Sequence, residues 1–234
     1  MLNLLSKQNN EQEESHWLSV SDLMAGLMIV FLFIAIAMMR HAYIERDKIK
    51  QVAVAYQENQ VAIFDALNDE FKADLKVWNA EINEETLTFT FKSPEVLFET
   101  GEANLNGAYK KLLDDFFPRY MQVLTPFKSS INEVRIEGHT SSAWGAATDD
   151  RAYFENMRLS QGRTRAVLQY VYLLPKVNAD KQWVKKHIAA VGLSSSRLVY
   201  YKSGRENNTA SRRVSFRVIT NSDIQIKRIL EGVQ

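Results

Sequence analysis

Asp22 is the residue whose position most directly suggests chemistry. It lies directly before an uninterrupted apolar run, residues 23–39, and five residues after Trp17. Trp side chains favour the headgroup level of a membrane, and a helix rises about 1.5 Å per residue, so Asp22 would lie about 7.5 Å deeper than Trp17. A carboxylate inside a membrane helix costs about 2.5–3.5 kcal/mol, whereas a first-turn acid at the interface is ordinary. Two interpretations stay open: a residue that marks the helix start, and a proton or sodium carrier that faces a partner helix.

A second group of candidate residues surrounds a predicted long helix. Arg163 carries a planar guanidinium suited to bidentate binding of a carboxylate. Asn156 lies seven residues before it, so both share one helix face with Leu159 between them. Thr140 and Ser141 follow a predicted strand and place hydroxyl and backbone N–H groups at a loop edge. This combination is suited to a ligand that carries carboxylates.

Each of these residues also has a purely structural interpretation. Arg163 could form a surface ion pair with Glu155 or another acid. A turn-stabilising role is the stronger interpretation for His139, and Arg212 with Arg213 could be a solvated strand edge. The sequence alone leaves these alternatives open.

The composition excludes several classes of function. The chain has no cysteine, and its histidines (His16, His41, His139 and His187) are scattered, so thiol chemistry, disulfides and a histidine metal site have no support. The net charge is +1, which argues against a nucleic-acid-binding protein. A hydrolase would need paired carboxylates or a Ser/His site, and the sequence indicates neither. We therefore expect a protein that is not an enzyme and holds no metal or cofactor.

Residues 17–40 are predicted to form an uncleaved transmembrane helix after a short N-terminus, residues 1–16. As a helix, the stretch from Trp17 to Met39 is about 34 Å long, enough to cross a bilayer core of about 30 Å. The preceding segment is acidic and no small-residue cleavage site follows, which disfavours a signal peptide. An excess of Lys and Arg after the helix favours, by itself, a cytoplasmic C-terminus.

Residues 41–82 read as an amphipathic helical linker. Its apolar residues recur at steps of three, four and seven, which makes a narrow stripe on one face (Ile49, Val52, Tyr56, Ile63, Leu67, Phe71, Leu75 and Trp78). Packing on the following domain, self-association of two copies and closure of a channel mouth all remain open for this stripe.

Residues 83–220 predict a compact α+β domain, with residues 221–234 as a C-terminal tail. The patterns predict strands at residues 86–92, 131–137, 198–202 and 213–220, and helices at residues 106–120, 153–174 and 182–191.

Four landmarks in this domain resemble the OmpA C-terminal-like peptidoglycan-binding fold. They are Phe98, Gly101 and Leu105 of an F-x-x-G-x-x-x-L box; Gly138, His139 and Thr140 of a G-H-T turn; Asn156, Leu159, Ser160 and Arg163 of an N-x-x-L-S-x-x-R helix; and Arg212, Arg213 and Val214 of a late R-R-V strand. The resemblance implies peptidoglycan binding by Asn156, Leu159, Arg163, Thr140 and Ser141. The chain departs from the family at one position. Family members have an acid after the G-H-T turn, which binds the ammonium group of the peptide stem, and this chain has Ser141 there. Asp149 and Asp150, in an apparent insertion, are candidates for that negative partner.

The arrangement of the whole chain is similar to the MotB class of stator subunits, and most similar to the ZorB-type subunits of Zorya anti-phage defence systems. Flagellar MotB subunits carry the motif W-x-x-x-Y-A-D-F-M-T-A-M-M. Trp17 and the segment from Asp22 to Met28 follow its outline with one residue fewer. The resemblance implies an inner-membrane homodimer with a polytopic MotA-like partner (ZorA), and Asp22 as carrier of a translocated proton or sodium ion. It also implies a cytoplasmic N-terminus and a periplasmic C-terminal domain, against the Lys/Arg count. A flagellar MotB-type subunit and a static membrane-to-wall tether are the alternatives.

Overall fold

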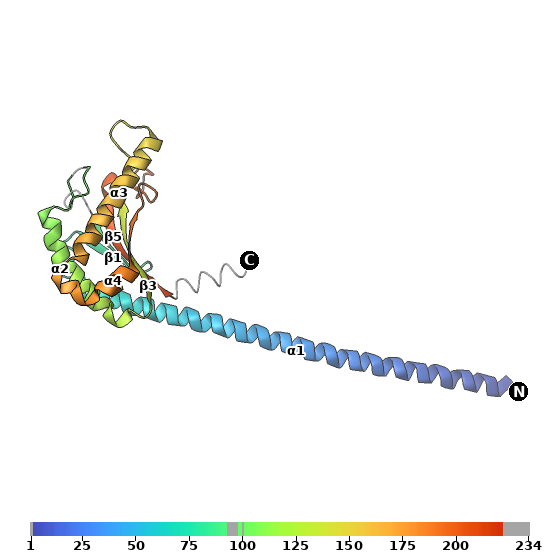
Figure 1. Ribbon diagram of the computed structural model, residues 1–234. Helices are drawn as coiled ribbons and strands as arrows, with labels where there is room; N and C mark the ends of the chain where they lie inside the picture. The colour runs from blue at the N-terminus through green and yellow to red at the C-terminus, as the bar shows by residue number, and fades with distance from the viewer. Residues whose placement is uncertain (1, 93–97, 100, 222–234) are drawn as a thin grey trace. The chain divides into compact units, whose positions relative to one another are not determined.

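The computed structural model describes residues 2–92, 98–99 and 101–221; within the first helix, the side chains of residues 2–16, 18 and 19 are outside this description. The expected C-terminal tail therefore lies outside the described residues, except for Asn221. The chain divides into two units, residues 1–52 and residues 53–234, which are considered separately (Figure 1).

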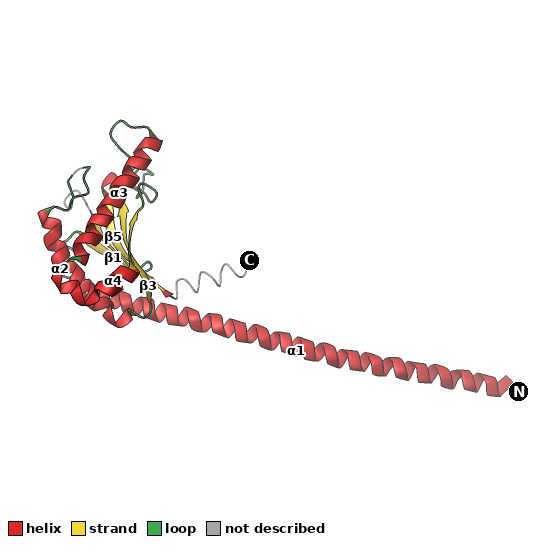
Figure 2. Ribbon diagram, viewed as in Figure 1, coloured by secondary structure: helices red, strands yellow, loops and turns green. Residues whose placement is uncertain are grey.

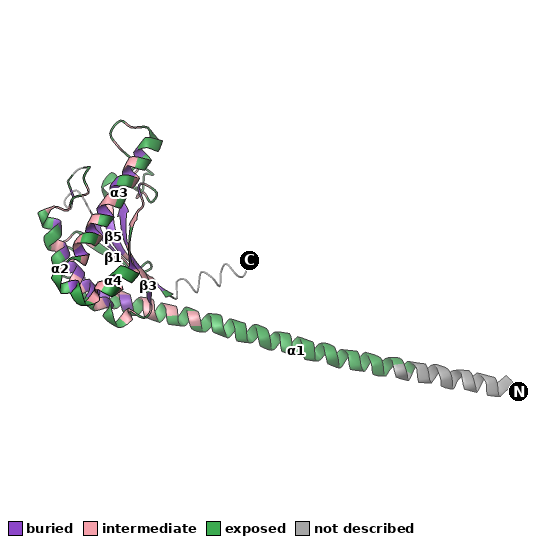
Figure 3. Cartoon of the chain, viewed as in Figure 1, coloured by how far each residue is buried: buried purple, intermediate pink, exposed green. Residues whose placement is uncertain are grey.

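The first unit consists of helix α1 (Leu2–Phe71) up to residue 52. Every described side chain from Val20 to Gln51 is exposed, including the whole apolar run (Figure 3). Within the described residues, α1 is the one helix long and apolar enough to cross a membrane. A helix segment that exposes apolar side chains on all sides fits a lipid environment better than water.

The last turns of α1 belong to the second unit. Ile63, Leu67 and Phe71 are fully buried in its core, and Leu75 and Trp78 pack against that core from the following turn. Packing on the domain is thus the role of the second half of the predicted apolar stripe. The helix ends at Phe71, so the expectation of helix up to residue 82 was wrong in its last part.

A five-stranded mixed sheet forms the centre of the second unit, in the order β1-β2-β5-β3-β4. The strands are β1 (Ala80–Asn83), β2 (Thr88–Lys92), β3 (Ile131–His139), β4 (Ile188–Gly192) and β5 (Arg213–Thr220). Strand β5 pairs antiparallel with β2 and β3, and β3 pairs parallel with β4. The α+β fold class is confirmed.

Helices cover one face of this sheet (Figure 2). They are α2 (Gly107–Leu124), α3 (Asp149–Tyr172) and α4 (Lys181–His187), with the short α5 (Asn208–Ser211) before β5. Asn106 begins α2 by accepting a hydrogen bond from the Tyr109 N–H with its side chain. The aromatic rings of Phe89, Phe116 and Phe216 meet at centroid distances of 4.7–5.0 Å between sheet and α2.

Two predicted elements differ in the structure. Residues 182–191, expected as one helix, are α4 from its second residue onward followed by strand β4, because the short apolar stretch Ile188–Gly192 pairs with β3. The strand expected at residues 198–202 is a loop with a single isolated bridge between Tyr200 and Glu206. Short apolar runs fit helix and strand equally well, and pairing partners decide between them.

Alternation along the strands gives the sheet two different faces. In β3, Val134 and Ile136 are buried toward the helices, whereas Arg135 and Glu137 project from the opposite face. In β5, Phe216 lies in the core and Arg217 on the opposite face. The face away from the helices is therefore polar.

Candidate functional site

A pocket of about 270 Å³ lies at the carboxyl end of β3. It is lined by Gly101, Thr140, Ser141, Ala143, Trp144, Gly145, Asn156, Leu159, Arg163 and Arg212, which we call the loop pocket. All five residues predicted to bind peptidoglycan are among them. The structure thus brings together side chains from α3, from the loop after β3 and from the residue before β5.

Helix α3 supplies one wall of the loop pocket. Asn156, Leu159 and Arg163 are three and four residues apart and face the same side, as their helical spacing predicts. The Asn156 amide donates hydrogen bonds to the carbonyl oxygens of Ser141 at 3.1 Å and Ala143 at 3.4 Å. Asn156 is therefore a positioning residue that fixes the loop after β3 against the helix.

Arg163 is held by the segment before α2. Its Nε donates to the Glu102 carbonyl oxygen at 2.9 Å and Nη2 to that of Glu99 at 3.4 Å. The guanidinium carbon lies 4.8 Å from the centre of the Phe98 ring, and the residue is only 7% exposed. Glu155 is not its partner, since Glu155 pairs with Arg158.

Two of the landmark positions require glycine for steric reasons. Gly101 has φ +75°, a conformation that side chains rarely adopt, and it lies in the segment that holds Arg163. A Cβ at Gly138 would lie 2.8 Å from Thr164 Cγ2 and 2.9 Å from the Ser160 carbonyl oxygen. Glycine at position 138 therefore allows β3 to approach α3 closely where the pocket forms.

The loop after β3 presents polar groups to the pocket. Thr140 is 3% exposed, and its hydroxyl has no hydrogen-bond partner among the described residues. A buried polar atom without a partner is costly, so Thr140 Oγ1 is suited to bind a polar ligand atom. The neighbouring Ser142 donates to the Glu206 carboxylate from its N–H, at 3.1 Å, and from its hydroxyl.

The structure indicates which acid lies near Ser141, the position of the family acid. Asp149 and Asp150 are exposed in the first turn of α3, and neither lines the pocket. The carboxylate that contacts this loop is instead Glu206, which accepts hydrogen bonds from Ser142, the residue after Ser141. Its spacing in the sequence gives no signal, because its proximity depends on how the loop before α5 folds back.

Trp144 and Arg212 are pocket residues that were not among the predicted ligands. Trp144 is partly buried and lies in the loop between β3 and α3. Arg212 was expected to be either a landmark or a solvated strand edge; it lines the pocket, and its Nε donates to the Asn208 carbonyl oxygen at 3.2 Å. The late R-R pair was the one sequence signal that indicated Arg212.

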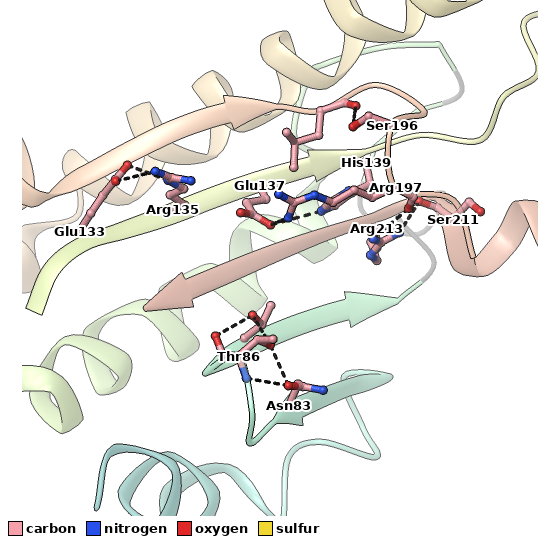
Figure 4. Close-up of polar contacts among 12 residues, drawn as sticks. Asn83, Thr86, Glu133, Arg135, Glu137, His139, Ser196, Arg197, Ser211 and Arg213 are labelled. Carbon is pink, nitrogen blue, oxygen red and sulfur yellow. Dashed lines mark hydrogen bonds and ion pairs between the residues drawn. The ribbon is translucent and has the colours of Figure 1, made fainter. Parts of the chain in front are cut away.

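His139 lies on the other face of the sheet (Figure 4). It is 4% exposed, with Nε2 at 3.6 Å from Glu137 Oε2, a carboxylate oxygen that Arg197 also approaches at 3.4 Å. Burial lowers the pKa of the His139 imidazole, which the nearby Glu137 opposes. Burial raises the pKa of Glu137, but the nearby His139 imidazole and the charge of Arg197 bring it below the usual value. His139 therefore does not line the loop pocket.

Asp22 belongs to the other unit, on the exposed helix α1. Next to it, the Ser21 hydroxyl donates to the Trp17 carbonyl oxygen at 2.8 Å, a contact within the helix. The structure of one chain thus leaves the Asp22 carboxylate on a helix surface directly before the apolar run.

Comparisons with known proteins fit this architecture. Residues 97–212 match the OmpA family. Among solved structures, a MotB-like protein from Desulfovibrio vulgaris covers 69% of this chain and 91% of its own, with 20% identity and a TM-score of 0.48. The type VI secretion cell wall anchor from Pseudomonas aeruginosa covers 66% and 97%, with 20% identity and a TM-score of 0.45. The family match lies entirely within the second unit.

Two relatives extend over nearly the whole chain. A Zorya protein ZorB from Escherichia coli (strain ATCC 8739) is 52% identical over 97% of this chain and 98% of the relative. Another Zorya protein ZorB, from Escherichia coli O139:H28, is 22% identical over 91% of this chain and 83% of the relative. The chain belongs to the ZorB family of Zorya proteins.

Proposed function

We propose that this chain is the wall-anchored, MotB-like subunit of an ion-driven stator complex in the inner membrane that acts in anti-phage defence. The observation that carries this proposal is the loop pocket, where a buried hydroxyl and two guanidinium groups meet in an OmpA-family domain. Membership of the ZorB family and the exposed apolar helix support the membrane part.

The ligand of the loop pocket is the peptide stem of peptidoglycan. Arg163 and Arg212 provide charge-assisted hydrogen bonds for its carboxylates, and Thr140 Oγ1 provides a further polar contact. Leu159 contributes apolar contact, and Ser141 lines the pocket beside Thr140. The binding is non-covalent and needs no catalytic group.

Asp22 is the proposed carrier of the translocated proton or sodium ion. An acid next to the apolar run of α1 is costly in lipid unless a partner supplies a polar environment. A polytopic MotA-like subunit (ZorA) would provide that environment, and a homodimer would bring two copies of Asp22 to it. Anchoring to the wall requires a cytoplasmic N-terminus and a periplasmic domain.

The test is phage plating with Asp22→Asn, with membrane abundance measured in the same cells. Asn keeps the size of the side chain but removes the titrating group, so we expect normal abundance and complete loss of protection. Asp22→Glu keeps a titratable carboxylate and should retain part of the protection. Asp47→Asn is the matched control, since Asp47 is an exposed acid on the same helix beyond the apolar run.

A static membrane-to-wall tether is the second candidate, favoured by the fact that the loop pocket is complete without Asp22. A tether needs anchoring alone, which Asn provides as well as Asp. Full protection by Asp22→Asn at normal abundance would therefore overturn the ion-driven proposal in favour of the tether.

A further inference from the structure

The polar face of the sheet carries a second hollow, separate from the loop pocket. It has a volume of about 250 Å³, and we call it the sheet hollow; its lining residues come from β1, β2, β3, β5 and the loop after β4 (Glu81, Asn83, Thr86, Thr88, Thr90, Glu137, His139, Arg197, Arg213, Ser215 and Arg217). None of these residues lines the loop pocket. Consecutive residues at the start of β5, Arg212 and Arg213, serve the two different sites.

The acids of the sheet hollow already have cationic partners. Glu137 is approached by Arg197 at 3.4 Å, as Figure 4 shows, and Glu81 pairs with Lys92. Arg213 donates to the carbonyl oxygens of Ser211 at 3.0 Å and Arg197 at 3.1 Å. Neither Arg213 nor Arg217 has a carboxylate within 4.0 Å in the part of the chain that the structure describes.

Two buried polar atoms in the sheet hollow also lack partners among the described residues. Arg217 Nε is a buried donor without an acceptor, and His139 Nδ1 belongs to a side chain that is 4% exposed. Such atoms are rare in folded proteins and usually indicate an ion, a water molecule or a ligand. Register places Thr88 opposite Arg217 and Thr90 opposite Ser215. The Thr88 hydroxyl donates to the Thr86 carbonyl oxygen at 3.1 Å, so Thr90 and Ser215 are the candidate hydroxyl donors of the hollow.

We propose that the sheet hollow binds an oxyanion, a carboxylate or phosphate group, between Arg213 and Arg217. The unsatisfied Arg217 Nε–H and the Arg213 guanidinium supply charge-assisted hydrogen bonds, and the hydroxyls of Thr90 and Ser215 supply neutral ones. Glu137 lies opposite Ser215 and already interacts electrostatically with Arg213 and Arg217. The ligand adds a second negative charge beside the guanidinium groups of Arg197, Arg213 and Arg217. The domain then has two anion sites, one on each side of the end of β3.

The test is calorimetric titration of the full-length chain in detergent with inorganic phosphate, and separately with malonate, at constant ionic strength. We expect saturable binding of at least one of them, and the preferred anion identifies phosphate or carboxylate as the ligand group. Arg217→Gln should weaken binding about tenfold or more, because it removes a charge-assisted hydrogen bond. The absence of saturable binding of both anions to the wild-type chain would overturn the proposal.

Arg135→Gln is the matched control. Arg135 lies opposite Arg217 on the same face, but it is paired with Glu133 at 3.0 Å and does not line the sheet hollow. We expect it to change the affinity less than about threefold, since an exposed ion pair contributes little. Equal losses from both variants would show a diffuse charge effect and overturn the site.

A competition experiment separates this site from the loop pocket. Saturating phosphate or malonate should leave binding to purified sacculi unchanged, and Arg217→Gln should bind sacculi as the wild type does. Displacement of the chain from sacculi by the anion, together with anion binding that survives Arg217→Gln, would assign the anion to the loop pocket instead. Failure of sacculus binding alone would count against the proposed function and leave the anion site standing.

Discussion

The end of β3 separates two sites with different ways of holding arginine. On the loop side, Arg163 is fixed by the carbonyl oxygens of Glu99 and Glu102 and by the Phe98 ring, and the described lining of the pocket contains no carboxylate. On the sheet side, the hollow includes Glu137, already paired with Arg197. Backbone carbonyls orient a guanidinium without cancelling its charge, whereas carboxylates neutralise it. The described contacts of Arg163 therefore orient its guanidinium, whereas the described contact of Arg197 is with a carboxylate.

Arg163→Ala should produce the largest change in sacculus binding. Loss of a charge-assisted hydrogen bond to a carboxylate costs about 1.5–3 kcal/mol, or about 10- to 100-fold in affinity. The measurement is co-sedimentation of the full-length chain with purified sacculi, with circular dichroism as a check on folding. Arg158→Ala is the control, since Arg158 is exposed on the same helix and pairs with Glu155. Equal binding by both variants would place the wall site elsewhere.

Gly138→Ala should have the next largest effect, on the fold that separates the two sites. The added Cβ would lie 2.9 Å from a backbone oxygen of Ser160, and such overpacking costs about 1–3 kcal/mol. Gly107→Ala is the matched control because a Cβ there meets nothing within 4 Å. Denaturant unfolding monitors both variants. Unchanged stability of Gly138→Ala would show that β3 and α3 are not packed as described.

Asn156→Ala should weaken sacculus binding more modestly, and it tests positioning rather than charge. The variant loses the hydrogen bonds to the carbonyl oxygens of Ser141 and Ala143, worth about 0.5–1.5 kcal/mol each. We expect a loss of about three- to tenfold, with phosphate binding at the sheet hollow unchanged. A loss as large as that of Arg163→Ala would mean that Asn156 itself contacts the ligand.

The smallest expected effect is on the pH dependence of stability, on the sheet side alone. The pKa of His139 is lowered in the folded state, so the unfolded chain binds more protons and stability is lost as pH falls below about 6.5. The lowered pKa of Glu137 adds a loss at more acidic pH, below its ordinary value of 4.5. The melting temperature should fall between pH 7.5 and 5.5, by about 2–4 °C for each 1 kcal/mol lost. His139→Gln should flatten this dependence; an unchanged slope would assign it to other groups.

Local periodicity explains which features could be predicted from the sequence. Asn156, Leu159 and Arg163 were identified by their resemblance to the OmpA helix motif, and helical spacing predicted that they share one face. Strand β4 was missed because a short apolar run becomes a strand only through its pairing with β3. Trp144 and Glu206 reach the site through loops, whose paths depend on tertiary contacts that no spacing encodes.

Asp22 marks the other limit of prediction from one chain. The apolar run of α1 could be recognised from its length and composition alone. The role of Asp22 beside it stays a prediction. The surroundings of the carboxylate would come from another subunit, so neither this sequence nor this structure contains them. The loop pocket, in contrast, is assembled entirely from its own chain.

The most direct test of the wall-binding account is photo-cross-linking in cells. A benzophenone amino acid would replace Ala143, which lines the loop pocket, or Thr88, which lines the sheet hollow. After irradiation, sacculi are boiled in detergent and probed for covalently retained chain. The account predicts retention from position 143 and none from position 88. Retention from position 88 alone would contradict it, because the wall would then be bound on the polar face of the sheet.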